Sequence, residues 1–533
     1  MNAQKIFYNG SIITMSETQK AVEAVAIDGE HIKAVGALEE VKNILGSDAE
    51  LVNLHGRALL PGFIDSHMHP IMYIFFLFNL DLSDVRSVDE LERLIFESSE
   101  KKQEGEWILG LRLNEENFKI PEERKLPTRW DLDKACSEKP VFIVRYDGHI
   151  GIANSLALEL ANIDEKTKIP GGGEIRKNTD GELTGIISEE ALDILYSKIS
   201  LPGPEEIMDT SEQAFKNLAS KGITSIHGLL EYDRARGVEF SIAKAIQDKV
   251  LQNWYCLINT ITPKKLKRLK KPPLDNGKRE SRFKIGGLKT FADGTFGAAT
   301  ACMFEPFTDQ PDKCGFCVVE EGKLYEQMVV AHKLGFQIGI HTIGDKGNRL
   351  VVDLYNKLLN EYPRDDHRHR IEHASILTPD VIEDIQKLNL IASCQPSFLN
   401  SEYNWLEKRL GKERLKYTYP YKSLIEAGIK VAAGSDCPVE VPDVIMGLHA
   451  LVTRNGLNKD ECIPVYDALK MYTINGAFAA FEEDIKGTIE SGKYADLVIL
   501  DKNPLKLKDH EIKHLQVIET IVRGKTIYKK ERD

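Results

Sequence analysis

Short apolar runs that end in a polar residue recur along the chain. The first, residues 61–70, delivers His67 and His69 at its end. Side chains in a strand alternate between its two faces, so these two histidines should point the same way. Four later runs end at Lys289, His341, His373 and Asp436. Each run predicts a short buried strand.

The distances between run ends predict strands joined by crossover helices. From His341 to His373 is 32 residues, close to the roughly 30 that one strand–helix unit needs. From His373 to Asp436 is 63, about two units, with the intervening strand at 390–395. Runs at 223–227 and 251–258 complete a set of eight. We therefore predict an α/β fold, a closed (β/α)8 TIM barrel with its active face at the carboxyl ends of the strands.

The chain of 533 residues is longer than the roughly 250 that such a barrel needs. Between His67 and Lys289 lie 222 residues, where three units would use roughly 100. We predict an inserted α+β domain at 82–200, a lid that shapes the substrate pocket. Alternating runs at 1–60 and 481–533 predict one small β-sandwich built from both termini. Residues 61–81 and 201–480 are left for the barrel.

Five of the eight predicted strands end in a residue with metal-binding chemistry. Imidazole is the commonest protein ligand of zinc-like ions, and parallel strands bring their carboxyl ends to one face. The sequence therefore predicts a metal site at the mouth of the barrel.

Several segments resemble the amidohydrolase superfamily, in particular its amidohydrolase-3 branch of YtcJ-like hydrolases. The resemblance extends over nearly the full length, and the branch includes enzymes that deformylate N-substituted formamides. The segments that carry it are 61–69, 146–149, 154–158, 184–189, 288–294, 341–345, 371–374 and 434–438.

The resemblance implies a centre of two divalent metal ions. Nitrogen-rich sites bridged by oxygen suit zinc, cobalt, nickel or iron, and we expect zinc. The implied ligands are His67, His69 and Asp436 for one ion, His341 and His373 for the other, and Lys289 between them.

Lys289 resembles the family's bridging lysine, which reacts with carbon dioxide to form a carbamate. An unmodified ammonium has donors but no lone pair, so it cannot bind metal, whereas a carbamate offers two oxygens. Two alternatives stay open: Lys289 pairs with a carboxylate such as Asp293, or Glu189 supplies the bridge.

The implied reaction is hydrolysis of a carbon–nitrogen bond, other than a peptide bond, in a small amide or formamide-like molecule. Bound metal lowers the pKa of water toward 7 and polarises the substrate carbonyl. Asp436 would take the proton of the water and pass it to the leaving nitrogen.

Other polar residues are candidates for binding substrate or orienting a ligand. Asp147 and His149 follow an apolar run, although a surface loop would place them equally well. Asp345 follows His341 by four residues and could orient it, or could belong to a solvated turn. Gln395 ends the seventh predicted strand and faces the mouth if the register is as we expect.

Composition restricts the partners. A net charge of −12 argues against a nucleic-acid partner, because no basic balance drives release of counterions. The sequence predicts no signal peptide and no membrane span, and eight scattered cysteines suit a reducing compartment. We expect a cytoplasmic protein with a small-molecule substrate, and a homo-oligomer is compatible with the sequence.

Two other functions stay open. A deaminase of the same fold would use one metal ion and no bridging lysine, so Lys289 favours amide hydrolysis. A non-catalytic scaffold should have lost ligands, yet all six ligand positions hold residue types that could serve.

Overall fold

The computed structural model describes residues 4–46, 48–146, 148–167, 173–199, 202–232, 237–260, 263–268 and 281–531. The chain divides into two compact units. One comprises Met1–Ile71 and Glu212–Asp533, and the other comprises Met72–Ser211.

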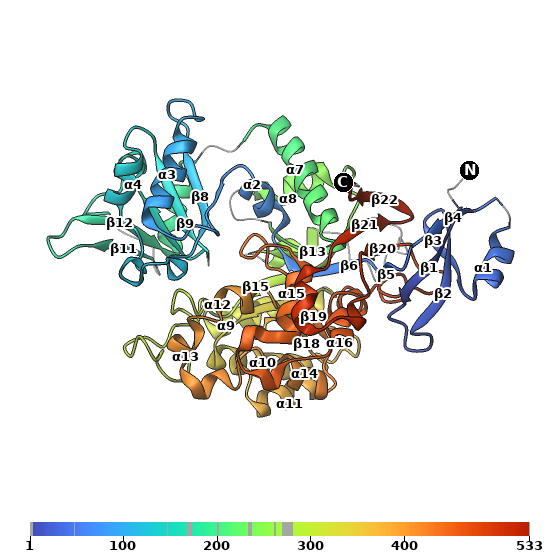
Figure 1. Ribbon diagram of the computed structural model, residues 1–533. Helices are drawn as coiled ribbons and strands as arrows, with labels where there is room; N and C mark the ends of the chain where they lie inside the picture. The colour runs from blue at the N-terminus through green and yellow to red at the C-terminus, as the bar shows by residue number, and fades with distance from the viewer. Residues whose placement is uncertain are drawn as a thin grey trace. The chain divides into compact units, whose positions relative to one another are not determined.

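Eight parallel strands form a barrel in the larger unit (Figure 1). All eight predicted strands are present, and the predicted TIM barrel is confirmed. In spatial order the strands are β6 (Phe63–Met68), β13 (Ile223–Glu231), β14 (Asn253–Asn259), β15 (Phe283–Phe291), β16 (Gln337–Thr342), β17 (Arg370–His373), β18 (Ile391–Cys394) and β19 (Val431–Ala433).

The barrel closes between its first and last strands beside the predicted ligands. The backbone N–H of Asp436 donates to the carbonyl of His67 at 2.7 Å, and the N–H of His69 donates to the carbonyl of Cys437 at 2.7 Å. The closure therefore fixes the backbone of His67, His69 and Asp436 together.

Helices follow the strands and pack on them through one apolar face. In α10 (Asp345–Glu361) the buried residues include Val351, Tyr355 and Leu358, which recur at helical spacing. The Tyr355 hydroxyl lies 3.0 Å from the carbonyl oxygens of both Ile338 and Arg370, which joins the helix to two strands. The other helices after β13 are α8 (Val238–Ile246), α9 (Glu321–Lys333), α11 (Pro379–Lys387), α12 (Phe398–Glu402), α13 (Leu406–Leu415), α14 (Tyr421–Glu426), α15 (Val444–Thr453), α16 (Val465–Met471) and α17 (Ile474–Ala479).

Strands from both termini form a second sheet. Figure 1 shows the N-terminal strands, in blue, beside the C-terminal strands, in red. The two sets join where β5 pairs antiparallel with β20. The order is β22 (Lys525–Lys529), β21 (Val517–Val522), β20 (Leu497–Leu500), β5 (Ala58–Pro61), β1 (Gln4–Ile13), β2 (Ala21–Asp28) and β3 (His31–Gly36), with β4 (Glu50–Asn53) also on β1. The assignment of 1–60 and 481–533 to a separate β-sandwich domain stays a prediction.

The smaller unit contains a six-stranded mixed sheet. Alternate residues of β9 serve two cores, since Val141 and Ile143 pack on one face and Phe142 and Val144 on the other. A lid role for 82–200 stays a prediction. The strand order is β11 (Glu174–Lys177), β12 (Leu183–Ser188), β10 (Ile150–Ala153), β9 (Val141–Arg145), β8 (Ile108–Leu113) and β7 (Leu80–Asp81).

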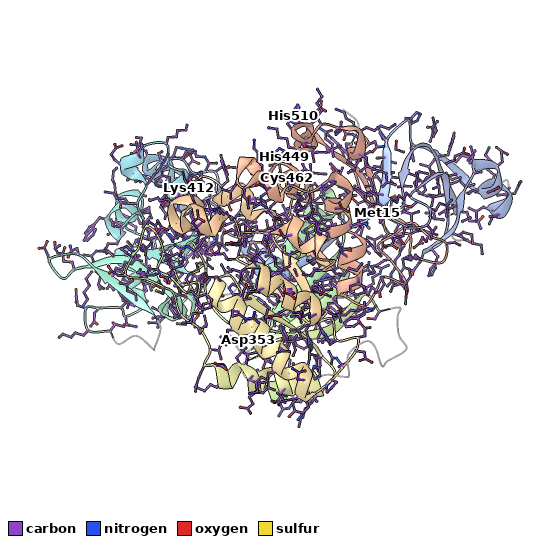
Figure 2. The ribbon with its side chains drawn as sticks, turned by 90° about the horizontal axis from the view of Figure 1, so that it is seen from below. Met15, Asp353, Lys412, His449, Cys462 and His510 are labelled. Atoms are coloured by element: carbon purple, nitrogen blue, oxygen red, sulfur yellow. The ribbon has the colours of Figure 1, made fainter. Side chains whose placement is uncertain are left out.

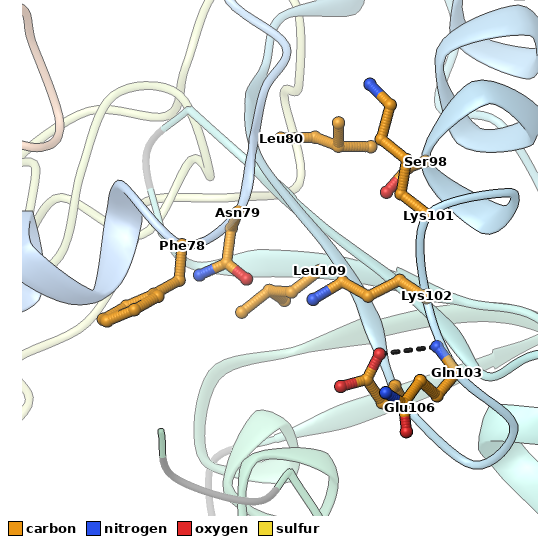
Figure 3. A pocket seen from close by; sticks show the side chains of 9 residues that line it. All are labelled: Phe78, Asn79, Leu80, Ser98, Lys101, Lys102, Gln103, Glu106 and Leu109. Atoms are coloured by element: carbon orange, nitrogen blue, oxygen red, sulfur yellow. Dashed lines mark hydrogen bonds between the residues drawn. The ribbon is translucent and has the colours of Figure 1, made fainter. Parts of the chain in front are cut away.

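A cavity of about 420 Å³ lies in this unit (Figure 3). Among the described residues, none that we predict to bind metal or substrate lines it. At its edge the backbone N–H of Gln103 donates to Glu106 at 2.6 Å. The lining residues are Phe78, Asn79, Leu80, Ser98, Lys101, Lys102, Gln103, Glu106 and Leu109.

The C-terminal part of the chain is attached to the barrel through α15. This helix is buried along most of its length, and the segment Asp509–His514 packs against it. Figure 2 labels His449 of α15 and His510 of that segment close together. Despite its apolar sequence α15 has only 10 residues. None of the helices in the described ranges has the length and apolarity needed to cross a membrane.

Three neighbouring histidines lie at the end of β17 that is opposite His373. His367 and His369 come just before this strand, and His332 belongs to α9. The N–H of Ile338 donates to His369 Nδ1 at 3.0 Å, so His369 Nε2 carries the proton and donates to His332 Nδ1 at 2.8 Å. His367 accepts from the N–H of His369 and donates to the carbonyl of Leu388 at 3.0 Å. Because each ring both accepts and donates, all three must be neutral.

These histidines should make the protein acid-sensitive. Burial lowers the pKa of His367 from 6.5 to about 4, so between these values the unfolded chain binds the proton and the folded chain does not. The stabilisation is complete above pH 6.5 and is lost as pH falls toward 4, by about 3 kcal/mol. His367→Asn, which can still accept from His369, should lower the Tm at pH 7.5 and have less effect at pH 4.5. An equal Tm difference at both pH values would contradict this assignment.

Candidate metal centre

His67 and His69 lie at the end of β6 and converge on Asp436, which follows β19. Both Nε2 atoms are 3.2 Å from Asp436 Oδ1, and one ligand atom from each residue fits within 4.8 Å of the others. Among the described residues, buried His67 Nε2 and Asp436 Oδ1 have no hydrogen-bond partner. The Nε2 atom of His67 and the Oδ1 atom of Asp436 are both buried and need a partner, which a cation bound between them would supply. This donor set therefore fits a divalent ion.

Two predicted ligands have a left-handed backbone. His373 has a φ of 73° and Asp436 a φ of 58°, a region that residues other than glycine rarely adopt. Such conformations cost on the order of 1–3 kcal/mol each and concentrate at functional sites. At both residues the left-handed conformation turns the backbone away from the direction of the preceding strand, at the mouth of the barrel.

The imidazole of His373 lies beside that of His67, and the imidazole of His341 lies beside that of His373. The ring centroids of His67 and His373 are 4.8 Å apart, and those of His341 and His373 are 4.4 Å apart. His373 Nδ1 lies 2.7 Å from Gln395 Oε1, and His341 Nε2 lies 3.1 Å from the carbonyl of Gly294. Since both acceptors are oxygens, each ring donates there and its other nitrogen carries the lone pair.

Lys289 lies near the end of β15 and is 1% exposed. Its Nζ lies 4.2 Å from the centre of the Phe291 ring, and in the described part of the chain no carboxylate lies within ion-pair distance of it. Burial lowers the pKa of Lys289 to about 8, against the opposing effect of Glu372 and Asp436. A buried amine without an anionic partner is unusual, because a buried charge is costly unless it is paired.

Asp293 does not pair with Lys289, which was one of the two alternatives. Its carboxylate accepts the backbone N–H groups of Cys302, Ile343 and Gly344 at 2.8 to 2.9 Å. Burial raises the pKa of Asp293 to about 7. Its role is to hold the chain that follows His341, and His341 Nε2 lies 3.8 Å from Oδ1.

Glu372 contacts the predicted ligand His67 and also Arg370. The sequence did not lead us to predict a role for either Glu372 or Arg370. Glu372 Oε2 lies 2.5 Å from His67 Nδ1, and Arg370 Nε lies 2.7 Å from Glu372 Oε1. Burial raises the pKa of Glu372, but Arg370 and His67 outweigh it and hold this pKa well below its usual range. The available signal was two charges at alternate positions of the apolar strand 370–373, which places both on one face.

Asp65 was also missed. It lies on β6, and its Oδ1 accepts the N–H groups of His67 at 3.1 Å and of Ser435 at 3.0 Å, while Oδ2 accepts the Ser435 hydroxyl at 2.6 Å. Burial raises the pKa of Asp65 to about 6. Asp65 thus ties the first strand to the loop that carries Asp436.

Comparison with known proteins agrees with this geometry. A model described as the amidohydrolase family matches residues 50–528. The chain belongs to this family. It is 30% identical to the putative amidohydrolase YtcJ of Bacillus subtilis, over 98% of this chain and 99% of that protein. It is 27% identical to an N-substituted formamide deformylase of Arthrobacter pascens, over 98% of each chain.

Among solved structures, an uncharacterized metal-dependent hydrolase from Pyrococcus horikoshii is similar to this amidohydrolase, with a TM-score of 0.76. That protein is 28% identical, and the match covers 95% of this chain and 99% of the other. A deaminase of Caldanaerobacter subterraneus matches only 21% of this chain. The protein is therefore a metal-dependent hydrolase of the amidohydrolase family.

The remaining candidate residues of this amidohydrolase lie in three settings. Gln395 orients His373, as given above. Asp345 is half-buried, and its Oδ1 accepts the N–H groups of Phe304 and Lys346, so it does not hold His341. Asp147 lies outside the described residues.

His149 and Glu189 belong to the smaller unit. His149 Nδ1 lies 3.0 Å from Glu189 Oε2, and the N–H of Glu189 donates to the carbonyl of His149 at 3.0 Å. Glu189 has a φ of 53°, so this pair is also held with backbone strain. A bridging role for Glu189 stays a prediction.

Glycine 339 provides the space that Glu372 occupies. A Cβ at Gly339 would lie 2.5 Å from Glu372 Oε1 and 3.0 Å from Leu257 Cδ2. We predict that Gly339→Ala displaces this carboxylate, lowers stability by about 1–3 kcal/mol and weakens metal binding, as measured by Tm and by competition with a chelator. Gly322→Ala in α9, where a Cβ meets nothing within 4 Å, should neither lower the Tm nor weaken metal binding. Parent-like values for Gly339→Ala would contradict the close packing.

Proposed function

We propose that this amidohydrolase hydrolyses the carbon–nitrogen bond of a small amide or formamide-like substrate at a centre of two divalent ions, with zinc as the expected metal. The observation that carries the proposal is Lys289, a buried lysine on the strand next to that of His341, with no carboxylate within ion-pair distance in the described chain. The similarity to a formamide deformylase over the full length supports this substrate class.

The environment of Lys289 favours its carboxylation. Only the neutral amine reacts with carbon dioxide, and a pKa of about 8 leaves roughly one molecule in ten neutral at pH 7, against fewer than one in a thousand for an ordinary lysine. The product is an anion with two oxygens. It would convert a buried cation that has no carboxylate partner among the described residues into a ligand.

The geometry supports the ligand sets that the resemblance implies. Divalent metal, when bound, lowers the pKa of water and polarises a carbonyl group. His67, His69 and Asp436 would hold one ion, because their ligand atoms already converge. His341 and His373 would hold the other, and carboxylated Lys289 would lie between the two.

Asp436 would move the proton. Its side chain is 10% exposed, so it reaches the mouth while its Oδ1 faces two imidazoles. It would accept the proton of the attacking water and donate it to the leaving nitrogen. The closure hydrogen bond at its N–H and the pairing of Ser435 with Asp65 hold it in place.

A deaminase with one ion is the second candidate. The convergence of His67, His69 and Asp436 would suffice for a single ion. That reading leaves buried Lys289 without a role.

We predict that the purified protein holds close to two metal ions per chain and that Lys289→Ala holds fewer, as measured by elemental analysis. Lys284→Ala is the matched control, because Lys284 is a lysine at the other end of β15 whose side chain is only 9% exposed and pairs with Glu482 at 2.5 Å. It should retain both ions. Amides and N-substituted formamides are then screened for release of amine.

The outcomes separate the two functions. One ion per chain that Lys289→Ala leaves unchanged, together with release of ammonia from a heterocycle, would replace the amidase with the deaminase. No metal under metal-replete conditions would overturn both.

A further inference from the structure

We infer that Glu372, held by Arg370, is a positioning residue that fixes the tautomer and direction of the His67 ring for metal binding. The inference rests on the proposed metal centre. It adds a residue pair that touches neither substrate nor metal but determines which nitrogen of His67 can serve as a ligand.

The hydrogen bond between His67 and Glu372 has a defined direction. Glu372 Oε2 lies 2.5 Å from His67 Nδ1, and an ionised carboxylate can only accept. His67 therefore carries a proton on Nδ1, so the nitrogen that can offer a lone pair to metal is Nε2. That atom is 3.2 Å from Asp436 Oδ1, on the side where the ligands converge.

Arg370 holds the carboxylate of Glu372 in place. Arg370 Nη2 donates to Glu372 Oε2 at 3.0 Å, to the carbonyl of Ser66 at 2.5 Å and to Ser393 Oγ at 2.8 Å. Arg370 Nη1 lies 3.0 Å from His227 Nδ1. These contacts anchor the guanidinium to β6, β13 and β18, so the carboxylate has no room to turn away from His67.

Replacing one carboxylate oxygen of Glu372 by an NH₂ group would disturb this arrangement. A glutamine at 372 must direct its NH₂ group either at Arg370, where donor faces donor, or at His67 Nδ1. In the second arrangement Nδ1 accepts, the proton moves to Nε2, and the lone pair that faces the ligands is lost. The first arrangement loses the ion pair that holds residue 372, and the second loses the lone pair of His67 that faces the ligands, although the residue keeps its size.

A purely structural ion pair would give a different result, and the chain provides one for comparison. Glu482 is a buried carboxylate between Lys284 at 2.5 Å and Lys486 at 2.9 Å. Glu482→Gln also removes a buried negative charge, but its partners are no predicted ligands. It should lower Tm and leave metal binding unchanged.

The experiment measures metal affinity by competition with a chelator, and Tm, for Glu372→Gln and Glu482→Gln with Zn²⁺ as the probe. We expect Glu372→Gln to bind the more weakly held ion 10–100-fold less tightly, and Glu482→Gln to bind like the parent. Parent-like affinity in Glu372→Gln, or an equal loss in both variants, would overturn the inference.

A double-mutant cycle with His67→Ala tests whether Glu372 acts through His67. In the His67→Ala background, Glu372→Gln should cause no further loss of affinity, because the ring that it positions is absent. Additive losses would overturn the inference. If Glu372→Gln does not fold, Gly339→Ala takes its place in the cycle, because it displaces the carboxylate and keeps both charges.

The readout also separates this inference from the proposed function. A parent protein that binds metal but hydrolyses no amide would refute the proposed function, and the affinity loss in Glu372→Gln would still support the positioning role. A parent that binds no Zn²⁺ would overturn both.

Discussion

Charges inside a closed barrel must be paired, because the interior offers no water to solvate them. This constraint organises the described structure. Arg370 is fully buried and is tolerated because Glu372 lies against it and three strands supply acceptors. Glu482 is flanked by two lysines, which outweigh the effect of burial and lower its pKa to about 2. Each of these buried charges thereby connects parts of the chain that are distant in sequence.

Glycine supplies the space for these carboxylates. A Cβ at Gly434 would lie 2.9 Å from Asp65 Oδ1, and one at Gly347 would lie 2.6 Å from Asp293 Oδ2. Both carboxylates accept backbone N–H groups at strand ends rather than pairing with cations. The mouth of the barrel is therefore shaped by small residues beside fixed acceptors, and the ligand-bearing turns are held from behind.

The sequence predicts the barrel strands well, because apolar runs that end in His67, His341 or Asp436 carry their own signal; the roles of these residues as metal ligands stay predictions. The supporting carboxylates are harder to predict. Asp65 and Glu372 lie inside buried strands, where a charge ordinarily counts against a strand, and their partners are far along the chain. Asp345 was predicted to orient His341 because of its position after the strand, yet the direction of the turn brings the carboxylate of Asp293 nearer to that ring.

The two ends of β15 show why one end of the barrel is the functional one. Lys284 and Lys289 lie on this strand five residues apart, and both side chains are largely removed from solvent. Lys284 has its counter-ion in Glu482, whereas Lys289 lies against an aromatic ring and has no carboxylate of the described residues within ion-pair distance. A fold selected for stability alone would pair or replace the second lysine. The strained φ angles of His373 and Asp436 and the unpartnered atoms of His67 and Asp436 lie at this same end, so the cost is concentrated where a bound cation would recover it.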